Sequence, residues 1–288
     1  MIVLTGAGGF IGSVVLGYLN KQGITDIAIF DDLPLETQYK NLVGKKFTAI
    51  HSASEMIYHD KDIECVIHLG ANSNTLEKDW TSIYKTNVYS TRMWNDYCVK
   101  NNIPFIFASS AAVYGNGNGP MNQYAFSKYV SEQDISGVVL RLFNVYGPNE
   151  YHKGRMASTI FHWYNQIQET GQFKLFEGSR LLRRDLIYVE DVARVIYYFV
   201  KNYKPGVYDL GTGISVDFES VADAVSSTIR KGSKNFIMMP DDLKAQYQKD
   251  TRADTTALKE AGVDVNSFLS INTGIYEYVQ YLDVKGYY

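Results

Sequence analysis

The sequence is short of the features that mark secreted, membrane-spanning and nucleic-acid-binding proteins. Only two of its 288 residues are cysteine, Cys65 and Cys98, and we expect both to be reduced structural thiols. No apolar run approaches the roughly 18 residues of a membrane span, and a first strand predicted from Ile2 leaves no room for a signal peptide. The net charge of −3 offers no basic surplus for nucleic acid, and the five histidines show no metal-ligand spacing. We therefore predict a cytoplasmic protein without membrane, nucleic-acid or metal partners.

Short apolar runs alternate with helical segments through the first half of the chain. The predicted strands cover residues 2–5, 26–30, 47–50, 65–69, 105–108 and 138–142, and helices such as 11–21 and 83–100 lie between them. This alternation predicts parallel strands joined by right-handed crossovers, which build a doubly wound sheet with helices on both faces. The predicted fold class is therefore α/β.

The pattern changes after residue 144. A helix is predicted over 156–169, strands over 173–176, 185–188 and 207–210, and helices over 218–230 and 271–283. We interpret residues 1–144, with parts of 185–215, as a dinucleotide-binding domain. Residues 145–288 then form a smaller C-terminal α/β lobe that binds the substrate.

The first predicted strand runs into a glycine-rich turn. Gly6, Gly9 and Gly12 follow it at three-residue intervals and open the first helix. Such a turn brings bare backbone and a helix N-terminus against a pyrophosphate. Asp31 ends the next strand 19 residues past Gly12 (31 − 12), near the place of the ribose-binding acid of a Rossmann-type domain. A purely structural glycine turn is the alternative, and this context disfavours it.

The residues after the second strand bear on the choice of nicotinamide cofactor. Asp31 and Asp32 are acidic, Gln38 is neutral, and Lys40 is the nearest downstream cation. A 2′-phosphate here would meet negative charge, so these residues by themselves favour NAD over NADP.

A serine, a tyrosine and a lysine form the candidate catalytic group. Ser110 follows a predicted strand, at the edge where ligands bind in open α/β sheets; a role in turn formation alone is its alternative. Tyr124 and Lys128 are four residues apart and share one face of a helix. An ammonium beside a phenol lowers the pKa of the phenol. Tyr124 would then take the proton of a substrate hydroxyl while hydride leaves the carbon.

These motifs resemble those of the extended short-chain dehydrogenase/reductases, and the second half narrows the resemblance. The stretches 143–158, 175–179 and 183–189 are similar to those of the ADP-L-glycero-D-manno-heptose 6-epimerases, most specifically from His152 to Ser158. The resemblance runs nearly end to end. It implies a nucleotide-sugar epimerase with tightly bound NADP that inverts C6 of an ADP-linked heptose, a precursor of lipopolysaccharide. Hydride would leave C6 and return to the opposite face of the resulting ketone.

The resemblance also implies roles for individual residues. Lys153 would be a second acid/base group on the other side of the sugar from Tyr124, and a loop lysine or phosphate contact is its alternative. Arg184 would bind the pyrophosphate through its guanidinium fork, and a buried ion pair with Asp185 is its alternative. The cofactor contacts implied by the motif and the resemblance are Gly6, Gly9, Phe10, Ile11, Gly12, Asp31, Asp32, Leu69, Gly70, Ala71, Asn87, Tyr124, Lys128 and Val145. The implied substrate contacts are Asn144, Arg155, His162, Phe176, Glu177, Gly178, Ser179, Arg184 and Tyr247.

The sequence departs from the family at several places. Arg155 stands where the family has a small serine, and the segments 110–124 and 128–141 are both shorter than in relatives. Relatives use the helix that carries Tyr124 in a dimer interface. We therefore expect a homo-oligomer that is weaker than, or different from, the family assembly.

Three other functions fit parts of the sequence. An epimerase acting at C4 of another nucleotide sugar is disfavoured by the 152–158 stretch. A sugar 4,6-dehydratase needs an acid pair after the serine, and Ala111 and Ala112 stand there. A non-catalytic nucleotide-binding regulator would keep the fold alone, but the serine, tyrosine and lysine are all present.

Overall fold

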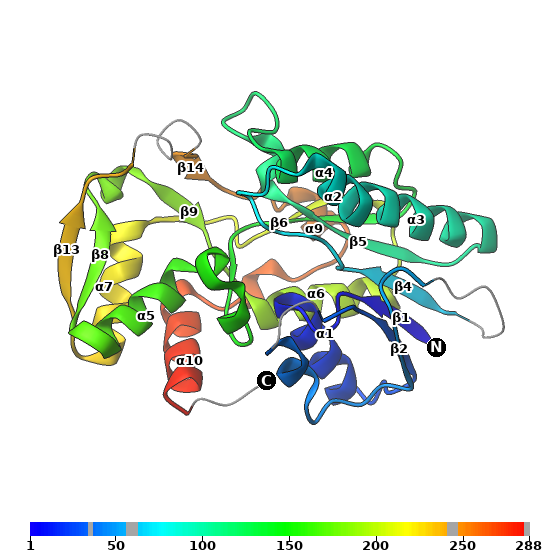
Figure 1. The fold of residues 1–288 in the computed structure, drawn as a ribbon, viewed down its shortest axis with the longest axis horizontal. Helices are drawn as coiled ribbons and strands as arrows, with labels where there is room; N and C mark the ends of the chain where they lie inside the picture. The colour runs from blue at the N-terminus through cyan, green and yellow to red at the C-terminus, as the bar shows by residue number, and fades with distance from the viewer. Residues whose placement is uncertain (34–36, 56–62, 241–246, 285–288) are drawn as a thin grey trace.

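The computed structural model describes residues 1–33, 37–55, 63–240 and 247–284. Within them, the largest sheet has seven parallel strands in the order β11-β6-β5-β4-β1-β2-β3 (Figure 1). These strands are β1 (Ile2–Thr5), β2 (Ile27–Phe30), β3 (Ala49–His51), β4 (Cys65–His68), β5 (Phe105–Ser110), β6 (Val138–Leu142) and β11 (Gly206–Leu210). The order reverses between β1 and β4, and ligands bind at such a reversal in doubly wound sheets. The predicted α/β class is confirmed.

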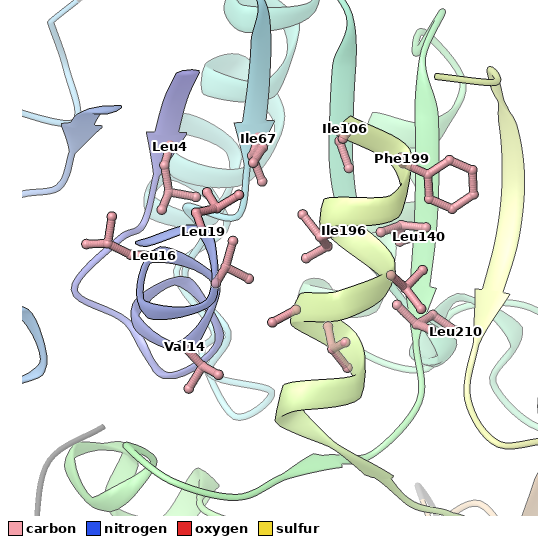
Figure 2. Packing of buried hydrophobic residues seen from close by; sticks show 14 of the residues in the cluster. Leu4, Val14, Leu16, Leu19, Ile67, Ile106, Leu140, Ile196, Phe199 and Leu210 are labelled. Carbon is pink, nitrogen blue, oxygen red and sulfur yellow. The ribbon is translucent and has the colours of Figure 1, made fainter. Parts of the chain in front are cut away.

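Helices cover both faces of this sheet. They are α1 (Phe10–Lys21) and α6 (Val189–Lys201) on one face, and α2 (Trp80–Ile83), α3 (Ser90–Asn101) and α4 (Gln123–Glu132) on the other. Leu16 of α1 and Ile196 of α6 belong to one core, in which Ile196 lies beside Leu140 (Figure 2), whereas Trp94 of α3 packs with Phe30 in the opposite core. Neighbouring residues of a strand point to opposite faces, so continuously apolar strands fill both cores.

The helix predicted over 83–100 contains an irregular segment. Between α2 and α3 the chain forms a π-helical turn, η2 (Tyr84–Tyr89), which includes the buried Asn87. Such turns are rare and frequently lie at functional sites. The side chain of Asn87 faces the loop after β4, where its amide donates to the Asn72 carbonyl at 3.0 Å.

The second half of the chain builds a separate core on the other side of the molecule (Figure 1). Its strands are β7 (Val145–Tyr146), β8 (Gln172–Phe176), β9 (Arg183–Asp185), β10 (Ile187–Tyr188), β12 (Ser215–Asp217), β13 (Ser233–Ile237) and β14 (Asp250–Thr251). Its longer helices are α5 (Thr159–Thr170), α7 (Phe218–Ile229) and α10 (Ile271–Val284). Strand β8 pairs with β13, β10 pairs with β7, and β9 lies between β12 and β14.

Two predicted boundaries in this half are wrong. The helix predicted from residue 156 begins at Thr159, because the Ser158 hydroxyl caps it by accepting a hydrogen bond from Phe161 N at 3.2 Å. Residues before that cap form a 3₁₀ segment, η4 (Tyr151–Met156). The strand predicted over 185–188 is two strands, β9 and β10, which pair in different sheets.

The last part of the chain returns to the large sheet before it ends. Helix α9 (Thr256–Glu260) and the 3₁₀ turn η6 (Val265–Ser267) place Leu258 and Val265 in the core under α1 and α6. Residues after 144 thus contribute to the core of the large sheet, and the division predicted at residue 144 stays a prediction about which part of the chain binds the cofactor and which the substrate. In the part of the chain that the structure describes, no helix is both long and apolar enough to cross a membrane, and Cys65 and Cys98 are free and buried.

Candidate active site

The glycine turn after β1 is shaped by close backbone approaches. Gly6 has φ +69°, and a Cβ atom there would lie 2.7 Å from the nitrogen of Gly70. A Cβ atom on Gly12 would lie 2.0 Å from the Gly6 carbonyl oxygen. Both positions therefore exclude any side chain. Gly9 is the N-cap of α1, so the turn presents bare backbone and a helix N-terminus, which fits a pyrophosphate.

An acidic side chain lies against this turn. The Asp31 carboxylate accepts hydrogen bonds from the backbone nitrogens of Gly8 and Leu33, both at 2.8 Å. Burial raises the pKa of Asp31, and these two donors oppose the effect. Asp32 is exposed and accepts from the Ser52 hydroxyl at 2.6 Å. The carboxylate of Asp31 therefore lies against the glycine turn, and its contact with a cofactor ribose stays a prediction.

The other residues predicted to contact the cofactor lie around the same sheet edge. Leu69, Gly70 and Ala71 directly follow β4, and Gly70 faces Gly6 across the reversal of strand order. The remaining candidates open α1, belong to the π-helical turn or begin β7: Phe10, Ile11, Asn87 and Val145. The residues present fit a dinucleotide, and the individual contacts remain predictions.

Ser110 and Tyr124 are brought together. Tyr124 is in the first turn of α4, whose N-terminus is capped by Asn122 through a 2.8 Å hydrogen bond from Ala125 N. Burial raises the pKa of the Tyr124 phenol, and a hydrogen bond with the Ser110 side chain opposes this. The Ser110 oxygen also accepts from Ala112 N at 3.1 Å. The motif therefore places a serine and a tyrosine in direct contact at the carboxyl end of β5.

Lys128 lies one helical turn further along α4 and is buried. Its ammonium donates to the Ala108 carbonyl at 2.7 Å and lies 4.7 Å from the centre of the Phe107 ring. Burial lowers the pKa of Lys128 to about 7, against the opposing charge of Glu132. The expectation that this ammonium lowers the pKa of Tyr124 is wrong for this structure. Burial dominates at the phenol, and the ammonium is directed at a carbonyl.

The loop that carries Lys153 lies against the cofactor-binding half. The Lys153 ammonium is 5.5 Å from the centre of the Phe10 ring at the start of α1. Burial lowers the pKa of Lys153, and the nearby Glu150 opposes the effect. Next to it, the Thr75 hydroxyl donates to the sulfur of Met156 at 3.5 Å. A residue of the second half is thus held beside the glycine turn.

Two residues that hold this loop were not predicted as site residues. Glu150 is buried, and its carboxylate accepts from both the backbone nitrogen (2.5 Å) and the hydroxyl (2.6 Å) of Ser158. Asn149 is also buried, has φ +74°, and donates to the Ser13 hydroxyl of α1 at 3.0 Å. Asparagine tolerates this left-handed conformation better than most residues. That preference, within a Gly-Pro-Asn sequence, is the one signal that could have identified it.

A polar network behind Ser110 was also missed. Arg141 of β6 donates to the Glu132 carboxylate at 2.6 Å and to the Tyr114 hydroxyl at 2.7 Å. Tyr114 in turn donates to the Asp209 carboxylate at 2.6 Å. Tyr114 ends η3 (Ala111–Tyr114), the 3₁₀ turn that follows Ser110. These hydrogen bonds hold η3 in place and join residues that are far apart in the sequence, so no local sequence signal predicts them.

Several predicted substrate residues form an aromatic and cationic cluster in the second half. The Arg184 guanidinium lies 4.8 Å from the centre of the Tyr247 ring and 5.4 Å from that of Phe218, and Phe176 packs edge-on against Tyr247. Arg184 forms no ion pair among the described residues. The alternative pair with Asp185 is absent, because that carboxylate accepts only from neighbouring backbone and hydroxyl groups. A buried cation between aromatic rings suits an anionic ligand.

The other predicted substrate residues differ in their relation to this cluster. Asn144 donates to the Thr251 hydroxyl at 3.1 Å, and Thr251 is the register partner of Arg184. Ser179 is buried, and its hydroxyl has no hydrogen-bond partner among the described residues. Among the described residues, no hydrogen bond, ion pair or ring contact joins the remaining positions to the cluster. Arg155 and Glu177 are exposed, Gly178 caps a 3₁₀ turn η5 (Ser179–Leu181), and His162 is half-buried in α5.

The short loop after Ser110 borders a cleft of about 810 Å³. Residues 115–117 line it together with Phe143, Asp209 and the segment 248–252. The Gln248 amide donates to the Gly115 carbonyl. The loop is therefore in direct contact with the segment that carries Tyr247. No group of side chains suited to a metal ion is found in the described ranges.

The glycine turn that fits a pyrophosphate, the serine–tyrosine pair and the buried arginine suited to an anionic ligand are typical of a nicotinamide-dependent enzyme with an anionic substrate, and comparison with known proteins gives a family of that class. The model of the NAD dependent epimerase/dehydratase family matches residues 2–211. The chain belongs to this family, which establishes a nicotinamide cofactor.

Comparison with individual proteins confirms the narrower resemblance. The ADP-L-glycero-D-manno-heptose-6-epimerase of Brachyspira hyodysenteriae is 38% identical over 317 residues, which cover 100% of this chain and 99% of that protein. Among solved structures, a UDP-N-acetylglucosamine 4-epimerase from Methanobrevibacter ruminantium has a TM-score of 0.85 at 22% identity, covering 99% and 98% of the two chains. The ADP-L-glycero-D-manno-heptose-6-epimerase of Helicobacter pylori has a TM-score of 0.83 at 23% identity, covering 98% and 96%. These two structures share the fold.

Proposed function

We propose that this protein is a nucleotide-sugar epimerase that inverts C6 of an ADP-linked heptose through a transient ketone. The observation that carries the proposal is the position of Lys153 beside Phe10, at the start of α1. Tyr124 reaches the sheet edge on α4, which covers the opposite face from α1. The two proposed acid/base groups are thus carried by elements that pack on different faces of the sheet, which supports access to the two sides of a carbinol.

The proposed chemistry assigns proton steps to this chain's own residues. A bound nicotinamide supplies the hydride acceptor and donor. Tyr124 takes the proton of the C6 hydroxyl as general base. The Ser110 hydroxyl, which is hydrogen-bonded to the phenol, orients the substrate oxygen. After the side chain of the sugar has rotated, Lys153 returns a proton to the oxygen on the other side. Lys128 holds the Tyr124 helix face against β5 through Ala108.

We assign the binding of the cofactor and of the nucleotide sugar to different halves of the chain. Residues 1–144, with parts of 185–215, hold the cofactor, and residues 145–288 hold the nucleotide sugar. The cluster of Arg184, Tyr247 and Phe176 is suited to the nucleotide diphosphate, because the buried guanidinium lacks a carboxylate among the described residues.

The experiment that tests the proposed reaction follows inversion at C6 by proton NMR with ADP-heptose as substrate. Tyr124→Phe should lower kcat about 10²- to 10⁴-fold, the contribution expected of a positioned acid/base group, while the cofactor stays bound. Tyr129→Phe, an exposed tyrosine on the same helix, is the matched control and should keep full activity. A Tyr124→Phe variant with near-normal turnover would exclude the proton role.

A second pair of variants tests Lys153. Lys153→Met should lower kcat much more than it raises KM, whereas Lys174→Met, an exposed lysine on β8, should change neither. A change in KM alone would make Lys153 a phosphate contact. Inversion at C4 of another nucleotide sugar, with none at C6 of ADP-heptose, would favour the 4-epimerase function, whose known structure shares this fold.

We propose NAD, and not the NADP implied by family resemblance, as the cofactor. Asp31 lies at the glycine turn, Asp32 is beside it, and Gln38 is neutral. A 2′-phosphate added at this place would be repelled. Mass spectrometry of the nucleotide that copurifies with the protein tests this, and NADP as the dominant species would contradict it.

A further inference from the structure

His68 is a buried histidine at the switch point that the proposed reaction does not use. It ends β4, its side chain is almost completely shielded from solvent, and its ring stacks near those of Phe105 and Phe107. Both ring nitrogens have partners. Nδ1 lies 2.8 Å from the Thr5 hydroxyl oxygen, and Nε2 lies 3.0 Å from the Thr91 hydroxyl oxygen.

The partners of these two hydroxyls, together with the burial of the ring, fix which atom donates in each hydrogen bond of the path from Thr5 through His68 to Thr91. The Thr91 hydroxyl donates its one proton to the Asn87 carbonyl at 2.5 Å, so its oxygen must accept from His68 Nε2. Burial keeps the His68 ring neutral, so its one proton is on Nε2, and Nδ1 accepts the proton of the Thr5 hydroxyl. The Thr5 oxygen then accepts from Gly70 N at 3.0 Å.

Each end of this hydrogen-bonded chain lies at a part of the candidate active site. At one end, Thr5 immediately precedes Gly6, and its hydroxyl holds Gly70, the residue that approaches Gly6 most closely. At the other end, Asn87 donates through its side chain to the Ser127 hydroxyl at 2.9 Å. That hydroxyl donates to the Tyr124 carbonyl at 2.7 Å. The path therefore joins the cofactor turn to the first turn of α4.

We propose that His68 is a positioning residue that holds the glycine turn and the Tyr124 helix in register across the sheet. The proposal rests on the proposed roles of Gly6 and Tyr124. The ring is rigid and donates on one side while it accepts on the other, so it fixes the separation of two hydroxyls that do not touch. The π-helical turn contributes by directing both the carbonyl and the side chain of Asn87 into the path.

A histidine that merely fills the core would show the same burial, so the test must detect coupling. The first measurement is the ¹⁵N NMR spectrum of His68 in the folded wild-type protein. We expect a neutral ring protonated on Nε2 throughout about pH 5.5 to 8, since burial and the Lys128 charge lower the pKa of His68 to about 3. A ring protonated on Nδ1, or on both nitrogens, would overturn the proposal.

The second measurement is a double-mutant cycle on cofactor binding. Thr5→Val and Thr91→Val each remove one hydroxyl at nearly constant shape. Each should weaken NADH binding about fivefold in a fluorescence titration, although Thr91 is no cofactor-binding candidate. Because either change breaks the same path, the double variant should also lose about fivefold and not the product of the two.

Thr86→Val is the matched control. It removes an exposed threonine hydroxyl from the same π-helical turn, one that donates to the Ser82 carbonyl at 2.8 Å, and should leave NADH binding unchanged. Multiplicative losses, or normal binding by a folded Thr91→Val variant, would leave His68 as a core residue. Neither measurement uses a sugar substrate, so failure of the epimerase function is detected separately, by the absence of C6 inversion in wild-type protein.

Discussion

At the scale of single residues, Lys128 gives the site a dependence on pH. Burial lowers its pKa from 10.5 to about 7. Between about pH 7 and pH 10.5 the unfolded chain binds a proton that the folded chain has released, so the free energy of unfolding rises with pH across this window. Below about pH 7 the lysine is charged in both states, and the folded protein bears the full desolvation cost of the buried ammonium. Lys128→Met removes the titration. The Lys128→Met variant should therefore be more stable than the wild type at pH 6, and this difference in the free energy of unfolding should shrink by about 3 kcal/mol from pH 6 to pH 9. Urea unfolding at the two pH values measures the difference.

Lys100→Met is the control for this prediction, because it removes an exposed lysine from a helix without desolvation. Its effect on the free energy of unfolding should be the same at both pH values. A difference between wild type and Lys128→Met that does not change with pH would mean that the Lys128 ammonium keeps its ordinary pKa in the folded protein.

The candidate site could be predicted from the sequence where a residue type and its position encode its role. Ser110 and Tyr124 come from a strand end and a helix start, and the structure joins them by a hydrogen bond. Asn149 could not be predicted in the same way. Its role depends on a left-handed backbone and on Ser13, which is 136 residues away in the sequence.

At the scale of elements, the start of α4 decides where Tyr124 is held. Asn122 caps this helix two residues before Tyr124. Asn122→Ala should cost about 1 kcal/mol of stability and, because the first turn then frays, should lower kcat about tenfold or more. Thermal unfolding and the C6 inversion assay measure the two effects.

A second cap separates the two effects. Asp79 caps α2 by accepting from Thr81 N at 2.9 Å, and α2 carries no candidate catalytic residue. Asp79→Ala should cause a similar loss of stability with unchanged kcat. Equal kcat losses in both variants would mean that general destabilisation, and not the position of Tyr124, limits turnover.

The elements themselves were predictable wherever the apolar period was regular. The strands of the large sheet fall within about two residues of their predicted bounds, because the inner strands bury both faces and the edge strands β3 and β11 are also largely apolar. The π-helical turn could not be foreseen, since it depends on the Asn87 contacts with Asn72 and Ser127. The separation of β9 from β10 likewise depends on their partners, β14 and β7, and on no signal in residues 183–188.

At the scale of the whole molecule, the two halves meet at the loop that carries Lys153. Asn149 contacts α1, the Tyr151 hydroxyl donates to the Thr37 carbonyl at 3.2 Å, and Met156 contacts the loop after β4. This loop follows residue 144 in sequence but packs on the cofactor-binding half. The period of apolar residues could not reveal that, because the contacts are polar and long-range.

The outer surface near α4 carries an aromatic patch made of Trp80, Tyr84, Phe126 and Tyr129. The Trp80 ring lies 5.4 Å from the Phe126 ring and 6.1 Å from the Tyr84 ring, and the other three side chains are each between 38% and 45% exposed. Tyr129 is three residues after Phe126 and so shares its face of the helix. Contiguous exposed aromatic surface of this kind is typical of protein interfaces.

We predict that two copies of this chain associate through the aromatic patch and that the dimer is weak. Helix α4 has only 10 residues, so it offers less surface than the roughly 800 Å² per partner of a stable interface. Light scattering should show a monomer–dimer equilibrium that shifts with protein concentration.

Phe126→Lys combined with Tyr129→Lys should give a monomer at every concentration, because two charges would have to be buried. Val99→Lys, at an exposed position on α3, should leave the equilibrium unchanged. A concentration-independent assembly that survives the double substitution would place the contact elsewhere on the molecule.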